Sequence, residues 1–285
     1  MNLTDIDPVA ALCAYHDETD PEQLILRLCR ELSGQCPTEA GPAPLPVLAS
    51  CQGVRRINHR PIDPAPGCSG FLLPVDGGYE IVVNSAECRE RQNFSVAHET
   101  VHTFFRDAFP RSWPSTREEQ LCNVGAAELT MPARRFSSYL AEVGLSMAGI
   151  DLCKEEFDVS FEAAARRAIN LTDDQACFLI AALGRTSEEE RMDTGQPVLR
   201  VVSWRASRSW PHVDGYQNRP VEPDSLIGKA FAYQDERRGR ARLGMPSDLA
   251  IYELEARGYG YPRNGNSDYR QAVSLARVPP GREAA

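Results

Sequence analysis

The sequence predicts an α+β chain in two parts, a mostly helical N-terminal part with a small β-sheet and a β-rich C-terminal part. Residues up to about 185 contain a series of capped helical patterns and one hairpin, whereas residues 197–285 contain strand-like runs among many Gly, Pro, Tyr and Trp. The polar residues 186–196 between them indicate a linker. A chain of 285 residues is long enough to form a hydrophobic core on each side of such a linker.

The first clear helix follows Asp20, which is suited to cap it. Pro21 fits the first helical position, Gln23 fits the capping-box position, and Gly34 offers a C-terminal stop. An apolar stripe at helical spacing consists of Leu24, Ile25, Leu28 and Leu32. The Pro-rich residues 37–46 are not expected to form regular structure.

A β-hairpin is predicted next. Residues 71–75 and 79–83 are strand-like, and the sequence Asp76-Gly77-Gly78 between them is typical of a turn. Because proline cannot donate a ladder hydrogen bond, Pro74 suits only an edge strand or a strand end. The hairpin would give the N-terminal part its small sheet.

Four helical patterns follow the hairpin. They cover about residues 92–106, 116–130, 161–170 and 172–184. Ser115 and Ser160 can cap the second and third, and Thr172 with Gln175 forms a capping box for the fourth. Short helices in series within residues 151–184 are compatible with a helix-turn-helix and equally with a plain helical spacer.

The C-terminal part is predicted to be a small β-domain that ends near Val278 and is followed by a disordered tail. Its clearest strands are residues 198–202 and 272–276. We expect Trp204 and Trp210 to fill its core rather than to line a ligand pocket. The arginine-rich residues 237–242 could bind an anion, but a solvated loop is the favoured interpretation.

Composition excludes several classes of protein. The net charge is −9, distributed as −13 over residues 1–196 and +4 over residues 197–285, which argues against non-specific nucleic-acid binding. No apolar run approaches the roughly 20 residues needed to span a bilayer, and the N-terminus lacks a secretory pattern, so we expect a cytoplasmic protein without membrane contact. The nine cysteines form no C-x-x-C pair and are expected to be reduced, mostly buried thiols.

The motif His98-Glu99-Thr100-Val101-His102 indicates a metal site in the predicted helix over residues 92–106. Residues four apart on a helix differ by about 40° in azimuth, so the two imidazoles can share one ion. Glu99 stands about 100° away, where its carboxylate can accept a proton from the water that the metal activates. The alternative is a chance motif with one histidine in the core and the other at the surface. The remaining histidines, His16, His59 and His212, have no comparable arrangement.

A catalytic zinc ion normally has a third protein ligand from another element. Spacing leaves two candidates on the next helix, Glu119 and Glu128. Glu118 suits the capping-box partner of Ser115, which would leave Glu119 free, although Glu119 could itself pair with Thr116. Tyr79, Asn123 and several arginines are all candidates for stabilising the oxyanion, and no spacing chooses among them.

The sequence resembles the IrrE/ImmA-type metallopeptidases, most closely the IrrE branch. The resemblance rests on the segments Ser69–Phe71, Ile81–Asn84, Arg89–Glu99 and Glu119–Pro132. It implies a zinc site. One ligand of that site is the glutamate three residues before the Cys-Asn pair, and this position is Glu119 here. Thr130 replaces an aliphatic residue that is common in the family, which is a minor departure.

The resemblance also implies a domain order and a function. It suggests a zincin-like metallopeptidase domain over residues 1–132, a helix-turn-helix segment over 133–185 and, after the linker, a GAF-like α/β sensor domain over 197–285. The implied activity is zinc-dependent cleavage of a helix-turn-helix transcriptional repressor, which would derepress stress or mobile-element genes. A small ligand at the C-terminal domain is a further expected partner.

A different class of function is a DNA-binding regulator with a structural zinc ion. Its recognition helix would contain residues 161–168, which include two basic residues and one acid. Because this is few charges for phosphate contacts, direct DNA binding is not expected.

Overall fold

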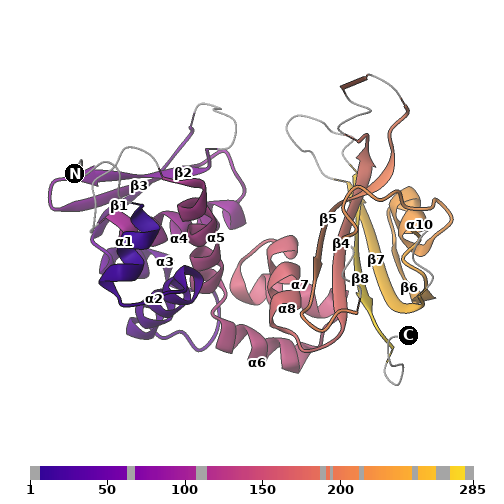
Figure 1. Ribbon diagram of the computed structural model, residues 1–285, viewed down its shortest axis with the longest axis horizontal. Helices are drawn as coiled ribbons and strands as arrows, with labels where there is room; N and C mark the ends of the chain where they lie inside the picture. Colours follow the sequence, from indigo (N-terminus) through magenta and orange to yellow (C-terminus); the bar gives the residue numbers. More distant parts are fainter. Residues whose placement is uncertain are drawn as a thin grey trace. The chain divides into compact units, whose positions relative to one another are not determined.

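The computed structural model describes residues 7–62, 68–106, 114–186, 191–192, 195–211, 215–245, 250–260 and 270–279 (Figure 1). The chain divides into two compact units. The first contains residues 1–139 and 152–164, and the second contains residues 140–151 and 165–285. Each unit has its own sheet and its own hydrophobic core, and helices and strands occur in both. The predicted α+β class is therefore confirmed.

The elements keep the labels of Figure 1. The helices are α1 Pro8–Tyr15, α2 Pro21–Gln35, α3 Leu45–Cys51, α4 Arg89–Arg106, α5 Thr116–Thr130, α6 Ala133–Val143, α7 Met147–Phe157, α8 Phe161–Leu171 and α10 Leu226–Tyr233. The strands are β1 Val54–Arg60, β2 Gly70–Val75, β3 Gly78–Asn84, β4 Ala176–Gly184, β5 Val198–Ala206, β6 Glu236–Ala241, β7 Tyr252–Gly260 and β8 Arg270–Arg277.

The first unit contains a three-stranded sheet in the order β1-β3-β2. Strands β2 and β3 form the predicted antiparallel hairpin, and Pro74 lies in the edge strand β2 as the sequence required. Gly77 adopts a φ of 71° in the turn, which explains the glycine there. Strand β1, which the sequence pattern did not indicate, pairs in parallel with β3.

Helix α2 confirms its predicted start. Asp20 accepts hydrogen bonds from the backbone N–H groups of Glu22 and Gln23, at 2.9 and 3.2 Å, and Pro21 occupies the first turn. The helix continues one residue past Gly34 and ends at Gln35. Its apolar stripe is buried with residues of α4 and α5 in the core of this unit.

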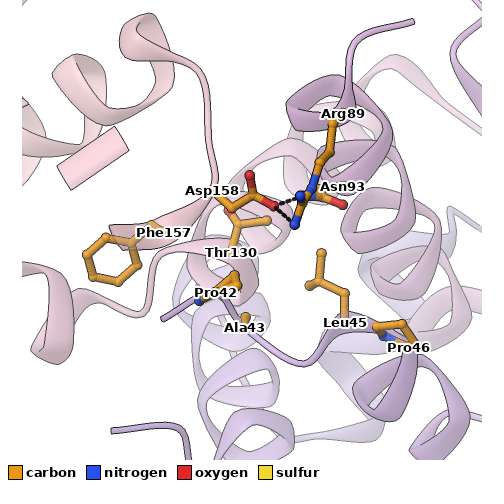
Figure 2. A pocket seen from close by; sticks show the side chains of 9 residues that line it. All are labelled: Pro42, Ala43, Leu45, Pro46, Arg89, Asn93, Thr130, Phe157 and Asp158. Atoms are coloured by element: carbon orange, nitrogen blue, oxygen red, sulfur yellow. Dashed lines mark hydrogen bonds and ion pairs between the residues drawn. The ribbon is translucent and has the colours of Figure 1, made fainter. Parts of the chain in front are cut away.

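The turn between α7 and α8 is bonded to the first turns of α4, within the same compact unit (Figure 2). Asp158 Oδ2 accepts hydrogen bonds from Arg89 Nη2 and Asn93 Nδ2, both at 2.8 Å. Asp158 has a φ of 52°, a left-handed conformation that aspartate tolerates better than most residues. Ser160 caps α8 as predicted, since its Oγ accepts from the N–H of Ala163.

The second unit contains a five-stranded antiparallel sheet in the order β5-β4-β8-β7-β6. The predicted helix over residues 172–184 is wrong, because β4 occupies Ala176–Gly184 in the interior of this sheet. A strand buried on both faces is a continuous apolar run, which periodicity cannot distinguish from a buried helix. Thr172 instead accepts a hydrogen bond from the N–H of Asp174 in a local turn.

The segment expected to link two domains connects neighbouring strands of this sheet. Strand β4 precedes it, β5 follows it, and the two pair antiparallel from Cys177–Ala206 to Gly184–Val198. The sheet therefore begins before the expected boundary at residue 185. Residues 187–190 and 193–194 of the segment lie outside the described residues, as do residues 280–285 of the expected tail.

The C-terminal core confirms one aromatic prediction and corrects the prediction for the arginine-rich run. Trp210 is buried and stacks on Tyr252, with ring centroids 5.1 Å apart. The arginine-rich run is the strand β6 and not a solvated loop. Arg237 forms two hydrogen bonds with Asp235, and Arg240 lies 3.6 Å from Glu253 of the neighbouring strand. One acidic partner precedes the strand and the other lies opposite on β7, and together they offset the charge of a sequence too basic to be recognised as a strand.

Within the described ranges, every helix is too short or too polar to cross a lipid bilayer.

Candidate metal centre

Helices α4 and α5 carry the side chains of the candidate centre, and a glycine lets them pack closely. A Cβ atom at Gly125 of α5 would lie only 2.7 Å from Cγ2 of Val101 and 3.0 Å from Cγ2 of Ile25. The next residue, Ala126, is fully buried. Gly125 therefore lies where α5 meets α4 and α2.

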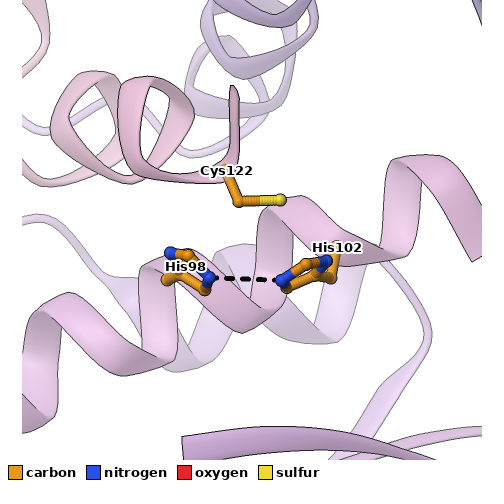
Figure 3. Close-up of side chains that lie close together, drawn as sticks. All are labelled: His98, His102 and Cys122. Atoms are coloured by element: carbon orange, nitrogen blue, oxygen red, sulfur yellow. Dashed lines mark hydrogen bonds between the residues drawn. The ribbon is translucent and has the colours of Figure 1, made fainter. Parts of the chain in front are cut away.

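The two histidines of the motif face one another on α4 (Figure 3). Their Nε2 atoms are 3.1 Å apart, as expected for residues one helical turn apart that share a face. Glu119 reaches both from α5, since its Oε2 is 3.1 Å from Nε2 of His98 and its Oε1 is 3.4 Å from Nε2 of His102. The structure thus brings together the three side chains that the sequence singled out.

This arrangement fits a divalent ion. In a tetrahedral zinc site with bonds of about 2.0–2.2 Å, the ligand atoms lie about 3.3–3.5 Å apart. The nitrogen and oxygen atoms of His98, His102 and Glu119 are separated by 3.1–3.4 Å, close to these tetrahedral edges. Two imidazole Nε2 atoms that face one another need a shared cation or a proton between them. The chemistry of these three donors is therefore that of a metal site.

The outer nitrogen of each imidazole has its own acceptor. Nδ1 of His98 is 3.1 Å from Oδ1 of Asn123, and Nδ1 of His102 is 3.1 Å from Oε1 of Glu118. A donated Nδ1–H fixes the tautomer in which the Nε2 lone pair points to the centre, and a carboxylate acceptor makes the imidazole a stronger ligand. Glu118 is only 2% exposed, which makes this bond well shielded from water.

Ionisable groups at the centre are strongly perturbed. Burial lowers the pKa of His102, but hydrogen bonds with Cys122, Glu118 and Glu119 outweigh it and raise that pKa to about 12. Hydrogen bonds from His102 and His98 hold the pKa of Glu119 well below its usual range. Without a metal, the centre therefore retains a proton on His102 beside an ionised Glu119.

Cys122 is a further ligand-type residue at this place. Its Sγ and one nitrogen of each imidazole all lie within 4.8 Å of one another, and Figure 3 shows the thiol beside the histidine pair. The residue is completely buried, and burial raises the pKa of its thiol to about 11. Sequence reasoning treated it only as one of several buried thiols.

Glu99 occupies a confined position on α4. Its side chain is 7% exposed, and the start of β2 passes directly over it. A Cβ atom at Gly70 would lie 3.7 Å from Cγ of Glu99 and 3.4 Å from Cβ of Ser95. A larger residue at Gly70 would first meet the backbone oxygen of Val82, 2.9 Å from its Cβ, so the strand lies in ordinary contact with the side chain that the motif assigns as the general base.

Glu128, the other candidate for the third metal ligand, points away from the two histidines. Glu128 lies nine residues after Glu119, which is about two and a half turns and hence the opposite face of the helix. Its Oε1 accepts hydrogen bonds from Nε of Arg30 and from the N–H of Ala133, both at 3.2 Å. Of the oxyanion candidates, Asn123 is engaged by His98 through its Oδ1.

Comparison with known proteins places the chain. A family model described as the IrrE N-terminal-like domain matches residues 56–168. The radiation response metalloprotease IrrE of Deinococcus radiodurans is 26% identical over 233 residues, covering 74% of this chain and 70% of that protein. The protein of the same name from Deinococcus deserti is 30% identical over 170 residues, covering 53% of this chain and 60% of that protein. Residues 56–168 of the chain therefore form a domain of the IrrE/ImmA type.

A solved structure extends the likeness beyond the matched domain. The chain of a Mycobacterium tuberculosis transcriptional regulator superposes with a TM-score of 0.57 and 16% sequence identity, covering 92% of both chains. At this identity the likeness concerns the fold alone. Residues 56–168, which match the IrrE N-terminal-like family model, include both helices of the candidate centre, α4 and α5.

Three residues of the centre escaped sequence reasoning. Glu118 appeared only as the capping partner of Ser115, whose Oγ does accept from the N–H of Glu118 while the carboxylate bonds His102. Asn123 appeared only as an oxyanion candidate, and Cys122 as a plain thiol. The spacing of Glu118, Glu119, Cys122 and Asn123 does predict that they lie on one side of a helix. Only the packing of α5 against α4 shows which of them contacts which histidine.

Proposed function

We propose that this chain is a zinc-dependent regulatory endopeptidase that cleaves a helix-turn-helix transcriptional repressor and so derepresses stress or mobile-element genes. One observation carries the proposal: the Nε2 atoms of His98 and His102 and the carboxylate of Glu119 meet at separations of 3.1–3.4 Å. These three side chains hold the metal, and Glu99 is the general base.

Zinc is the metal that this set of ligands favours. Two imidazoles and one carboxylate are the ligands of a well-known class of hydrolytic zinc sites, whereas magnesium and calcium prefer oxygen ligands alone. Three protein ligands leave a fourth position for the reaction.

The side chains of the centre divide the work of hydrolysis. When bound, zinc acts as a Lewis acid that polarises a carbonyl group and makes water acidic near neutral pH. Glu99 accepts a proton at its carboxylate and passes it to the leaving amine. Glu118 and Asn123 hold the imidazoles through their Nδ1 atoms. The burial of Glu99 beneath Gly70 keeps bulk water from its carboxylate.

The relatives support the peptidase class. Both Deinococcus proteins are named metalloproteases, and the aligned region spans 70% and 60% of their lengths. The choice of a repressor as substrate rests on the resemblance to the IrrE branch. The order of peptidase, helix-turn-helix and GAF-like sensor domains is part of the same proposal, with the sensor sheet beginning at β4.

A small ligand at the C-terminal domain fits the second unit. A cavity of about 550 Å³ lies there between the β4–β5 hairpin and α10, and its lining is largely apolar. Leu183, Val198 and Phe231 contribute to this lining. The volume falls in the range of about 300–1,000 Å³ that is usual for ligand sites. We assign the sensing role to this region.

The DNA-binding alternative has less support. The apolar side of α8 is buried at Ala164, Ala165 and Ala168, and Arg166 donates a hydrogen bond to Oγ of Ser203. An arginine that bonds to its own protein contributes less to a phosphate-binding surface.

The test compares the wild-type chain with Glu99→Gln in cells whose own copy has been deleted. New N-termini are labelled and identified by mass spectrometry, and zinc content is measured on the purified proteins. We expect the variant to retain zinc, and cleaved helix-turn-helix repressors to appear with the wild type alone. The same set of N-termini with both proteins, or no repressor among the cleaved proteins, would refute the proposal.

A further inference from the structure

Two groups of ligand-type side chains share the histidine pair between α4 and α5, one with Glu119 and one with Cys122, although a catalytic metal site needs only three ligands. Two belong to α4, His98 and His102, and two belong to α5, Glu119 and Cys122. The imidazole nitrogens and Sγ of Cys122 lie within 4.8 Å of one another, and the carboxylate of Glu119 is 3.1–3.4 Å from the imidazoles. Figure 3 shows the side chain of Cys122 alongside the two rings.

Helical geometry explains why Cys122 reaches this point. Residues three apart on a helix differ by about 60° in azimuth and about 4.5 Å in height, so Glu119 and Cys122 share the face of α5 that meets α4. The neighbours of Cys122 are engaged differently, because Glu118 and Asn123 bond the outer nitrogens of the two imidazoles. Cys122 and Glu119 thus each lie near the histidine pair.

We propose that Cys122 is a fourth protein ligand, so that the resting centre is a closed set of two histidines, one glutamate and one cysteine. This inference rests on the proposed function, since it concerns the same metal. The thiol binds as a thiolate, its proton passes to solvent, and a sulfur–metal bond forms without oxidation or reduction. Sites with four protein ligands are normally structural because no position is open. The thiolate therefore has to leave before a peptide can be cleaved, and the centre is latent at rest.

The buried position of Cys122 supports a role as a metal ligand over a role in core packing alone. A thiolate is a stronger ligand for zinc and for softer ions than a carboxylate, and a dry surrounding strengthens its bond to a cation. The Sγ atom of Cys122 lies within 4.8 Å of a nitrogen of His102. Cadmium, which is softer than zinc, should consequently lose more affinity than zinc when Cys122 is removed.

The experiment loads the full chain with Co²⁺ in place of zinc and records the absorption spectrum. A thiolate bound to Co²⁺ gives a charge-transfer band in the near ultraviolet that nitrogen and oxygen ligands do not give. We expect this band in the wild type, its complete loss in Cys122→Ser and Cys122→Ala, and its retention in Cys153→Ser. Cys153 is a matched control because it is equally buried but lies on α7.

The outcomes separate the two proposals. Stoichiometric Co²⁺ in the wild type without the band would overturn the role of Cys122 and leave the zinc peptidase proposal intact. Failure of the wild type to bind Co²⁺ or zinc at all would overturn both. A wild-type spectrum without the band decides against Cys122 even if a Cys122 variant does not fold.

Discussion

At the scale of single residues, the hydrogen bond between Glu118 and His102 is the clearest support for the metal ligands. We expect Glu118→Ala to weaken zinc binding by about 10–100-fold, because His102 loses the acceptor that fixes its tautomer and orientation. Glu118→Gln should lose less, since its amide oxygen can still accept from Nδ1–H. Competition titration with a chelating dye measures both, and Glu22→Ala on the surface of α2 is the control. Equal affinities of Glu118→Ala and the wild type would contradict this role.

Protonation of His102 predicts how zinc affinity depends on pH. The raised pKa, about 12 in the metal-free protein, means that His102 holds a proton throughout the neutral range. Zinc must displace it, so this proton alone should lower the apparent affinity about tenfold for each unit by which the pH is lowered. Calorimetry in buffers of different ionisation enthalpy should detect about one proton released from His102 per zinc ion at neutral pH, and a second proton where Cys122 also binds as a thiolate. Affinity that is independent of pH would show that His102 is not a ligand.

These residues also show how far the sequence can predict the site. The spacing of His98, Glu99 and His102 on one helix is a local property, and it can be read directly from the chain. Spacing alone also allowed Glu128 as the third metal ligand. The family resemblance was needed to favour Glu119 before the packing of α5 was known. The roles of Glu118 and Cys122 depend on the rotation of α5 against α4, which no local pattern specifies.

At the scale of elements, Gly125 controls the contact between the two helices of the centre. Gly125→Ala should lower the free energy of unfolding by about 1–3 kcal/mol, since its Cβ would lie 2.7 Å from Val101. Gly34→Ala is a matched helical control with open space around it, and it should be neutral or stabilising by up to about 1 kcal/mol. Urea unfolding followed by circular dichroism measures both changes. Similar effects of the two substitutions would mean that α4 and α5 are less closely packed.

Elements with local signals were predicted well, and those that depend on their surroundings were not. Helix α2 and the β2–β3 hairpin have caps and turn residues written in their own sequences. Strand β4 reads as a capped helix, and it becomes a strand because β5 and β8 lie on either side of it. Strand β6 is too charged for its pattern to be recognised, and the acidic residue opposite Arg240, Glu253, lies on another strand.

At the scale of the whole molecule, the division into two compact units implies that metal binding stabilises only the unit that contains the candidate centre. Zinc should slow hydrogen exchange of the amides in α4 and α5, because an ion that binds only the folded state suppresses local opening. The sheet of the second unit should exchange at an unchanged rate. Hydrogen–deuterium exchange with and without zinc measures this, and Glu119→Gln should abolish the protection. Equal protection in the second unit would place a metal there as well.

Metal content after exhaustive dialysis tests the central claim most directly. Wild type, Glu119→Gln and Glu128→Gln are loaded with zinc, dialysed and analysed by mass spectrometry, with folding checked by circular dichroism. Glu128 is the matched control, on the same helix but bonded to Arg30. We predict one zinc ion per chain in the wild type and in Glu128→Gln, and a large loss in Glu119→Gln. Full zinc in Glu119→Gln, or none in the wild type, would contradict the account.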